Sequence, residues 1–305
     1  MEGMETGPRG EAMMSLQKVD GTLDSRARGS SHTHRITGLH SLAVPATILL
    51  ILGLFLPLIS LLGPGNLSYD VQVLSPAVTF RVQWTTLKIA TAVALVVTLL
   101  GTCVALLLRE TTTFAQKVVL AICVFPLGVN IAFRVFGVQF VIAKLEAACE
   151  RILTVVTLGE VSPPSILFSQ AATVIGLVHW LLPIAVLVVF SAVARIRQDL
   201  IDNAELLGAP PLAVLFRVVL PSIMGEILLC FVLSFCLAYG AYITPAALGG
   251  LDDITLTRLI GNLLNEGQGA SAALPAVIGI LTPLAAFGLG ALLMRKFAYG
   301  NKNEA

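Results

Sequence analysis

Charged residues are scarce in this chain. Only 12% of its 305 residues are Asp, Glu, Lys or Arg, whereas soluble proteins carry about 25%. Hydrophobic residues make up 56% of the chain, and its mean hydropathy is +0.90. Such a chain has to place apolar surface in lipid, which excludes an ordinary soluble domain. The net charge of +1 gives no support for binding nucleic acid.

The residue patterns that catalysis and metal binding require are also missing. The chain has no G-x-x-x-x-G-K-[ST] phosphate-binding loop and no H-E-x-x-H sequence. Its five cysteines show no metal-ligand spacing, and all except Cys149 lie in apolar runs. His179 lies inside an apolar run, where we expect a packing and hydrogen-bonding role. The sequence thus predicts no catalytic residue, metal site or cofactor, and we expect that the chain is not an enzyme.

Six apolar runs are each long enough to cross about 30 Å of hydrocarbon as a helix. They cover approximately residues 42–62, 84–108, 118–138, 167–192, 222–248 and 272–294. The first run is longer than the apolar core of a signal peptide, and no small-residue cleavage site follows it. We expect it to be retained as a transmembrane helix. The sequence therefore predicts an all-α membrane protein with six transmembrane helices.

The distribution of Lys and Arg predicts the orientation. With residues 1–38 in the cytoplasm, 13 of the 19 Lys and Arg residues fall on the cytoplasmic side, as the positive-inside rule requires. Both termini are then cytoplasmic. Residues 1–38 lack apolar periodicity, and we expect a disordered tail. We expect residues 39–297 to form the membrane domain and residues 298–305 a short cytoplasmic tail.

The predicted cytoplasmic segment 199–221, DLIDNAELLGAPPLAVLFRVVLP, is a polar connection between two apolar runs. Leu200, Ala204 and Leu207 recur at helical spacing, so they predict a short helix with one apolar face. A helix of two turns is too short to be stable by itself. We therefore expect it to dock on another protein.

The ends of this helix carry local signals. We expect Asp199 to cap its N-terminus, with Asp202 completing a pair that resembles a capping box. Gly208 is placed to end the helix in the left-handed conformation. Pro210 and Pro211 then prevent the helix from restarting at once.

Two segments on the predicted outer side have the pattern of interfacial helices. Residues 140–158 alternate apolar positions with charged ones, and residues 251–264 carry a narrower apolar face. A partner protein or a lid is one use for such helices. Closing the helix bundle at the membrane surface is the other.

The 199–221 segment resembles the EAA loop of ABC importer permeases. The residues that carry the resemblance are Asp202-Asn203-Ala204, then Gly208 after three residues, and Leu220-Pro221. Asp replaces Glu and Asn replaces Ala at the first two positions of the loop pattern. The resemblance implies that Asp202, Asn203, Ala204, Glu205, Leu207, Gly208, Leu220 and Pro221 couple the permease to an ATPase.

Three further stretches extend the resemblance over about residues 40–297. Thr86 to Ala90 is similar to the opening of the permease core, and Phe125-Pro126-Leu127 with Arg134 resembles a pattern of polyamine permeases. The stretch 244–250, TPAALGG, resembles a signature of the first permease subunit of spermidine/putrescine-type importers.

The resemblance implies a type I ABC importer permease fold and a set of partners. These are a second permease, which gives a heterodimer or alternatively a homodimer, two ABC ATPases that bind ATP and Mg, and an extracytoplasmic solute-binding protein. It implies a multi-pass protein of the bacterial inner membrane that moves a polyamine such as spermidine or putrescine. Ferric iron, thiamine, opine and phosphonate-like solutes are alternatives. An ion-coupled secondary transporter and a membrane enzyme are the rival classes.

Six residues are candidates for lining the solute route: Asn130, Arg134, Tyr239, Tyr242, Thr244 and Pro245. Polar groups at membrane depth usually face the bundle interior or a water-filled path. Alternatively, Arg134 reaches the lipid headgroups, and Asn130 forms a hydrogen bond between helices. Pro245 removes a backbone donor, so it either creates a break in its span or a kink that neighbours repair.

Overall fold

The computed structural model describes residues 75–157, 165–251 and 253–300, together with helical residues between 44 and 56. Within these ranges the secondary structure is helical, without a strand. Residues 1–63 and 64–305 form two units, and the following description concerns the second. The predicted tail 1–38 lies outside the described residues, as do most of the predicted first span and of the C-terminal tail.

Three continuous helices are long and apolar enough to cross a membrane. They are α2 (Pro76–Arg109), α5 (Gln170–Val193) and α12 (Gly269–Gly300). Two bent pairs also qualify: α3 (Thr113–Val124) with α4 (Ile131–Thr157), and the helical segment 211–222 with α9 (Met224–Tyr239). The part of the chain that the structure describes therefore holds up to five of the six predicted spans.

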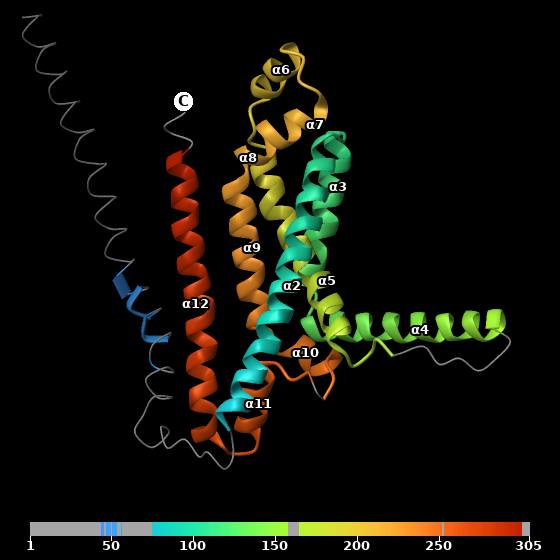
Figure 1. The fold of residues 1–305 in the computed structure, drawn as a ribbon, viewed down its shortest axis with the longest axis vertical. Helices are drawn as coiled ribbons and strands as arrows, with labels where there is room; N and C mark the ends of the chain where they lie inside the picture. Colours follow the sequence, from blue (N-terminus) through green and yellow to red (C-terminus); the bar gives the residue numbers. More distant parts are fainter. Residues whose placement is uncertain are drawn as a thin grey trace, which may run out of the picture. The chain divides into compact units, whose positions relative to one another are not determined.

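The predicted span 118–138 is not one straight helix. It divides into α3, a 3₁₀ turn at Phe125–Gly128 and the start of α4, and the chain bends by 107° between the two helices. Pro126 begins the tighter turn, and the Oδ1 atom of Asn130 accepts a hydrogen bond from the backbone N–H of Ala132 at 2.9 Å. Asn130 thus caps the new helix. The interfacial helix expected at 140–158 consequently begins at Ile131 and leaves the bundle sideways (Figure 1).

The predicted span 222–248 also divides. Helix α9 ends at Tyr239, and the short helix α10 (Ile243–Leu248) follows after a break at residues 240–242. Pro245 lies in the first turn of α10, where backbone donors have no helical acceptor. Of the two alternatives for Pro245, a break in its span and a repaired kink, neither is found, because the span breaks at residues 240–242, before Pro245. Helix α11 (Leu256–Asn265) confirms that the second predicted interfacial segment, 251–264, contains a helix.

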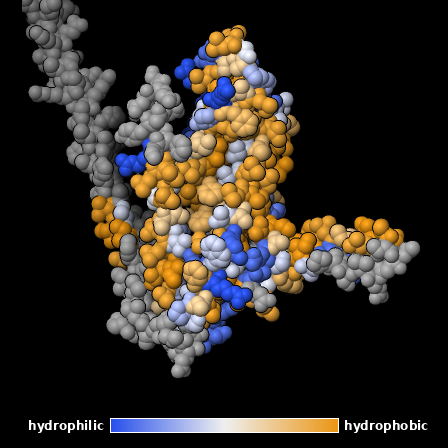
Figure 2. All heavy atoms as spheres, in the orientation of Figure 1, coloured by the Kyte–Doolittle hydropathy of each residue, from blue (hydrophilic) through white to orange (hydrophobic). Residues whose placement is uncertain are grey.

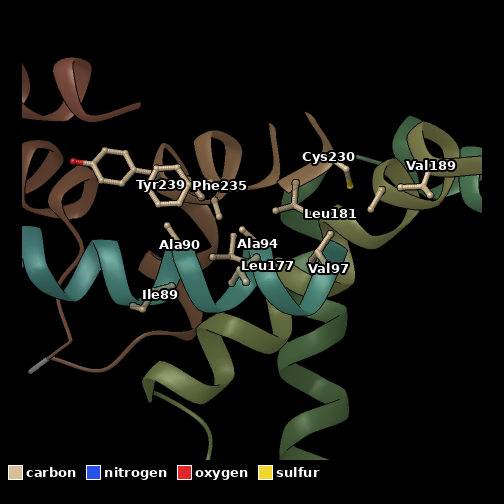
Figure 3. Packing of buried hydrophobic residues seen from close by; sticks show 14 of the residues in the cluster. Ile89, Ala90, Ala94, Val97, Leu177, Leu181, Val189, Cys230, Phe235 and Tyr239 are labelled. Carbon is tan, nitrogen blue, oxygen red and sulfur yellow. The ribbon is translucent and has the colours of Figure 1, made fainter. Parts of the chain in front are cut away.

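The core lies where α2, α5 and α9 run side by side (Figures 1 and 3). Small and β-branched residues of α2 face Leu177 and Leu181 of α5, and all of them are buried. A Cβ atom added to Gly101 of α2 would lie only 2.7 Å from Cβ of Ala185 in α5. In a membrane, helices associate through such close packing, because lipid is as apolar as a leucine side chain.

The close approach at Gly101 gives a test of this packing. We expect Gly101→Ala to lower thermal stability by about 1–3 kcal/mol, because the added methyl group forces α2 and α5 apart. Gly288→Ala in α12 is the matched control, since its Cβ would meet no atom within 4 Å. The measurement is thermal unfolding of the purified protein in detergent. Equal midpoints for the two variants would contradict the packing described.

Candidate functional site

The segment between α5 and α9 forms a projection at one end of the bundle (Figure 1). It contains α6 (Gln198–Leu206), α7 (Pro211–Val214), a π-helical turn at Leu215–Val219 and α8 (Leu220–Ser222). Helices α4, α10 and α11 lie toward the opposite end. The short helix predicted in segment 199–221 is therefore confirmed as α6.

The N-terminus of α6 differs from the prediction. Its N-cap is Arg197, which has an extended backbone and makes no side-chain cap, so the predicted cap by Asp199 is wrong. Asp199 lies in the first turn, where a carboxylate is favoured by the helix dipole, and it pairs with Arg197 at 3.1 Å. Asp202 accepts a hydrogen bond from Nε2 of Gln198 at 3.0 Å. The two acids therefore act within the first turns and do not form a capping box.

The C-terminus of α6 agrees with the prediction. Gly208 has a φ of +77°, the left-handed conformation expected of it. Its N–H donates to the carbonyl of Glu205 at 2.9 Å, and the N–H of Ala209 donates to the carbonyl of Ala204 at 3.1 Å. These two hydrogen bonds form a Schellman motif. The turn after α6 is thus fixed by backbone hydrogen bonds and depends on a glycine.

Large apolar side chains are exposed on this projection. Their exposed fractions are 84% for Leu206, 89% for Leu207, 69% for Leu212 and 63% for Phe216. The apolar tip is visible in Figure 2. On the predicted apolar face, Leu200 and Leu207 are exposed and Ala204 is half-buried. Clustered exposed apolar side chains at a loop tip are typical of a docking surface.

The other residues of the EAA-like pattern lie around this tip. Asp202, Asn203, Glu205 and Gly208 are exposed, Leu220 is half-buried, and Pro221 lies in the first turn of α8. Asp202, Asn203 and Glu205 thus place exposed polar side chains on the same short helix as the exposed Leu206. Protein interfaces combine apolar and polar contacts in this way.

Two polar contacts near the projection were not expected from the sequence. Nη2 of Arg109, at the end of α2, donates to Oε1 of Gln198 at 2.9 Å. Arg195, which follows α5, pairs with Glu226 of α9 at 3.3 Å. These contacts connect the start of α6 to α2, and α5 to α9. The sequence shows basic residues at the ends of α2 and α5, but sequence spacing does not identify their partners.

At the opposite end, the TPAALGG stretch packs against α5. A Cβ added to Gly176 of α5 would lie 2.8 Å from Cγ2 of Thr244 and 2.5 Å from Cδ1 of Leu248. A Cβ added to Gly250 would lie 2.5 Å from the carbonyl oxygen of Phe168. The stretch therefore lies against α5 and the residues just before it, so close that Gly176 and Gly250 have no room for a side chain.

Arg258 of α11 stabilises the same corner. Its Nη1 atom donates to the carbonyl of Gly250 at 2.9 Å and to that of Gly249 at 3.4 Å. Phe168, directly before α5, has a φ of +61°, which is uncommon for an aromatic residue. The motif thus joins α5, α10 and α11 into one packed unit. The sequence indicated the motif, but not that it is an interhelical contact.

Two of the candidate route residues lie at the start of α4: Asn130 directly precedes the helix, and Arg134 is in it. Asn130 is exposed and caps α4. Atoms Nε and Nη1 of Arg134 are buried and have no hydrogen-bond partner among the described residues. Asn130 and Arg134 were expected on one face of a straight span. They lie instead at the start of a helix that leaves the bundle.

Tyr239 is buried in a polar chain between helices. Its hydroxyl donates to Oε1 of Gln83 in α2 at 2.7 Å. Nε2 of Gln83 in turn donates to Oγ1 of Thr282 in α12 at 3.0 Å. Gln83 was not among the residues expected from the sequence. These two hydrogen bonds connect α9, α2 and α12, and they give Tyr239 a structural role. Its place on a solute route stays a prediction.

The remaining candidates differ in exposure. Tyr242 is 41% exposed, whereas Thr244 and Pro245 are buried in α10. The Thr244 hydroxyl has no hydrogen-bond partner among the described residues. The assignment of these residues to a solute route stays a prediction.

Comparison with known proteins identifies the family. Residues 113–299 match the model of the binding-protein-dependent transport system inner membrane component family. These residues include α3 to α12 and therefore both the projection and the TPAALGG corner. The chain belongs to this family and is a helical inner-membrane permease of the type I ABC importer class.

Relatives and solved structures agree with this assignment. The spermidine/putrescine transport system permease protein PotB of Escherichia coli K12 is 25% identical over 257 residues, covering 76% of this chain and 90% of its own length. PotB of Haemophilus influenzae is 28% identical over 187 residues, covering 61% of this chain and 63% of its own. These relatives are transport permeases rather than enzymes.

Solved ABC transporters share the fold. A bacterial alginate ABC transporter, in complex with an alginate-bound periplasmic protein, aligns with a TM-score of 0.69 at 17% identity, covering 85% of this chain and 94% of its own. The MetNI methionine ABC transporter aligns with a TM-score of 0.54 at 18% identity, covering 72% and 95%. At these identities the similarity shows the fold.

The hydrogen bond of Tyr239 separates a structural role from a role in the solute route. We expect Tyr239→Phe to lower thermal stability by about 1 kcal/mol, because Gln83 loses its donor. Tyr242→Phe is the matched control, since the Tyr242 hydroxyl makes no hydrogen bond within the part of the chain that the structure describes. Thermal unfolding and solute uptake are measured on both. Reduced uptake by Tyr239→Phe at unchanged stability would instead support the route.

Proposed function

We propose that this chain is a permease subunit of an ATP-driven importer and that α6 is its coupling helix. The observation that carries the proposal is the exposed apolar tip, Leu206 and Leu207, on a helix whose end is fixed by the Gly208 turn. An ATPase with a complementary cleft would cover these side chains. Burial of two leucines contributes about 3–6 kcal/mol to such an interface.

The contacts of the projection suggest how closure of the ATPase reaches the spans. A displacement of α6 acts on α2 through the Arg109–Gln198 hydrogen bond and on α9 through α7 and α8. The Arg195–Glu226 pair connects α5 to α9. ATP binding by the partner would thus reorient α2, α5 and α9 together. The solute site would then open alternately to the two sides of the membrane.

The proposed assembly contains two permeases, two ATPases and a solute-binding protein. ATP and Mg bind to the ATPases in this proposal. The chain covers 90% of the length of a permease named for spermidine/putrescine transport, and the alginate transporter was solved with its periplasmic binding protein. A heterodimer with a second, distinct permease is the preferred arrangement, because the TPAALGG stretch resembles one of two permease types.

A polyamine such as spermidine or putrescine is the proposed solute. The support is the similarity to the PotB proteins of two organisms. Among helices α2, α3, α5, α9 and α12, the sole carboxylate is Glu226, and Arg195 pairs with it. A tight site for a polycation needs several acids or aromatic rings. We therefore place the specificity mainly in the binding protein.

The proposed orientation puts the α6 end and both termini in the cytoplasm. Arg109, Arg195, Arg197 and Arg217 all lie at or beside the projection. A cytoplasmic excess of arginine agrees with the positive-inside rule. The route residues Asn130, Arg134, Tyr239, Tyr242, Thr244 and Pro245 then lie toward the outer part of the permease, where the binding protein delivers the solute.

The Gly208 turn provides the test of coupling. We expect Gly208→Val to reduce ATP-dependent spermidine uptake at least tenfold, because a β-branched residue is strained at a φ of +77° and displaces α7 from α6. Uptake of labelled spermidine into vesicles that contain the assembled transporter is measured with and without ATP, together with ATP hydrolysis.

Gly267→Val is the matched control. Gly267 ends α11 with a φ of +76° and the same pair of backbone hydrogen bonds, but at the opposite end of the bundle. The two variants carry a similar local strain, so only Gly208→Val should separate ATP hydrolysis from uptake. Full coupling in Gly208→Val would refute the coupling helix. Coupled uptake of another solute in place of spermidine would refute the polyamine assignment alone.

A further inference from the structure

A cavity of about 710 Å³ lies in the corner between α4 and α5. Helix α4 contributes one stripe of residues, including Arg134, Val138, Val141 and Leu145, and α5 contributes Ile175 and His179. The stripe continues to Cys149, so it extends for about 22 Å at 1.5 Å per residue. The stripe is thus long enough to hold a lipid acyl chain, which spans about half of a 30 Å hydrocarbon core, or about 15 Å.

The two charged side chains that line this cavity, Glu146 and Arg134, differ in their hydrogen-bond partners. Glu146 has its own partners, because its carboxylate accepts hydrogen bonds from the backbone N–H groups of Ile166 and Leu167 and from the Ser165 hydroxyl. Arg134 has no partner among the described residues, although its Nε and Nη1 atoms are buried. Burying guanidinium N–H groups without a partner is costly. Arg134 is half-buried, and an anion beside the apolar volume would satisfy its two buried nitrogens.

Helix α4 has the properties of a helix at the membrane surface. It leaves the bend at 107° to α3. Phe133, Phe136 and Phe140 are exposed on it, and Lys144 lies 5.2 Å from the centre of the Phe140 ring. Figure 2 shows its apolar surface beyond the bundle. Such a helix lies at the boundary between headgroups and acyl chains.

We propose that this cavity binds an anionic phospholipid. One acyl chain fills the apolar stripe of α4 against Ile175, and the phosphate accepts hydrogen bonds from the guanidinium of Arg134. A guanidinium presents paired N–H donors to a phosphate, which an ammonium does not. The cavity volume falls in the usual range of about 300–1,000 Å³ for small-molecule sites. The proposal assigns Arg134 to a lipid headgroup in place of the solute route. It depends on a membrane location and not on which solute is transported.

The test uses a photoactivatable lipid. The full-length chain, assembled with its co-purifying subunits, is placed in phosphatidylcholine nanodiscs that contain a trace of phosphatidylglycerol with a diazirine in its acyl chain. After illumination, mass spectrometry maps the adducts. We expect them at Val138, Val141 and Leu145 rather than at Phe133 and Phe136, and we expect unlabelled phosphatidylglycerol to compete better than phosphatidylcholine.

Three variants test the role of the charge. Arg134→Gln should reduce labelling of the stripe about tenfold, as expected for the loss of a charged hydrogen bond. Arg134→Lys should retain part of the labelling, because the charge remains without the paired donors. Arg151→Gln, an exposed position further along α4, should leave it unchanged.

Three results would overturn the proposal. Equal competition by unlabelled phosphatidylglycerol and phosphatidylcholine in the wild type would exclude an anion site. Unchanged labelling in Arg134→Gln would exclude the phosphate contact. Crosslinks from the stripe to another subunit, without lipid adducts, would show that a protein partner covers the cavity.

Discussion

The close packing of α2 on α5 is the contact on which the rest of the fold depends. Lipid supplies little drive for helices to associate, so contact has to come from matched surfaces. The absence of a side chain at Gly101 lets the backbones approach, and the small residues Ala90, Ala94 and Ala105 extend the contact along α2. Helix α9 then packs against the same pair.

This packed pair has consequences at both ends. At one end, Arg109 of α2 and Arg195 after α5 hold the projection that carries α6. At the other end, Gly176 of α5 receives α10 and the TPAALGG stretch. A movement imposed on α6 therefore acts on the same helices that hold α10. That arrangement suits a protein in which an event on one side of the membrane opens the other.

Much of this organisation could be predicted from the sequence. The apolar runs could be assigned as transmembrane spans because each is long enough, as a helix, to cross lipid. The turn at Gly208 follows from the low cost of a positive φ in glycine. The EAA-like pattern predicted the projection because all of its residues lie within one short stretch of the sequence.

The features that could not be predicted depend on contacts between distant residues. Hydropathy reads the run 118–138 as continuous, although Asn130 caps a new helix within it. Asp199 looked like a cap, but capping depends on where the backbone becomes helical. The helix begins at Gln198, two residues before the Leu200 start that a cap at Asp199 requires. The partner of Tyr239, Gln83, is 156 residues away, and no local pattern connects them.

Cysteine crosslinking at Glu205 tests the central claim most directly. Glu205→Cys is placed on α6 in a chain whose five native cysteines are replaced, and Glu266→Cys, at an exposed acidic residue that caps the C-terminus of α11, is the control. We predict a crosslink from Glu205→Cys to a co-expressed ATPase subunit that changes when ATP is added, and none from Glu266→Cys. No crosslink from Glu205→Cys or from other positions between Leu200 and Gly208 would contradict the coupling role, and a carrier that works without an ATPase would become the better account.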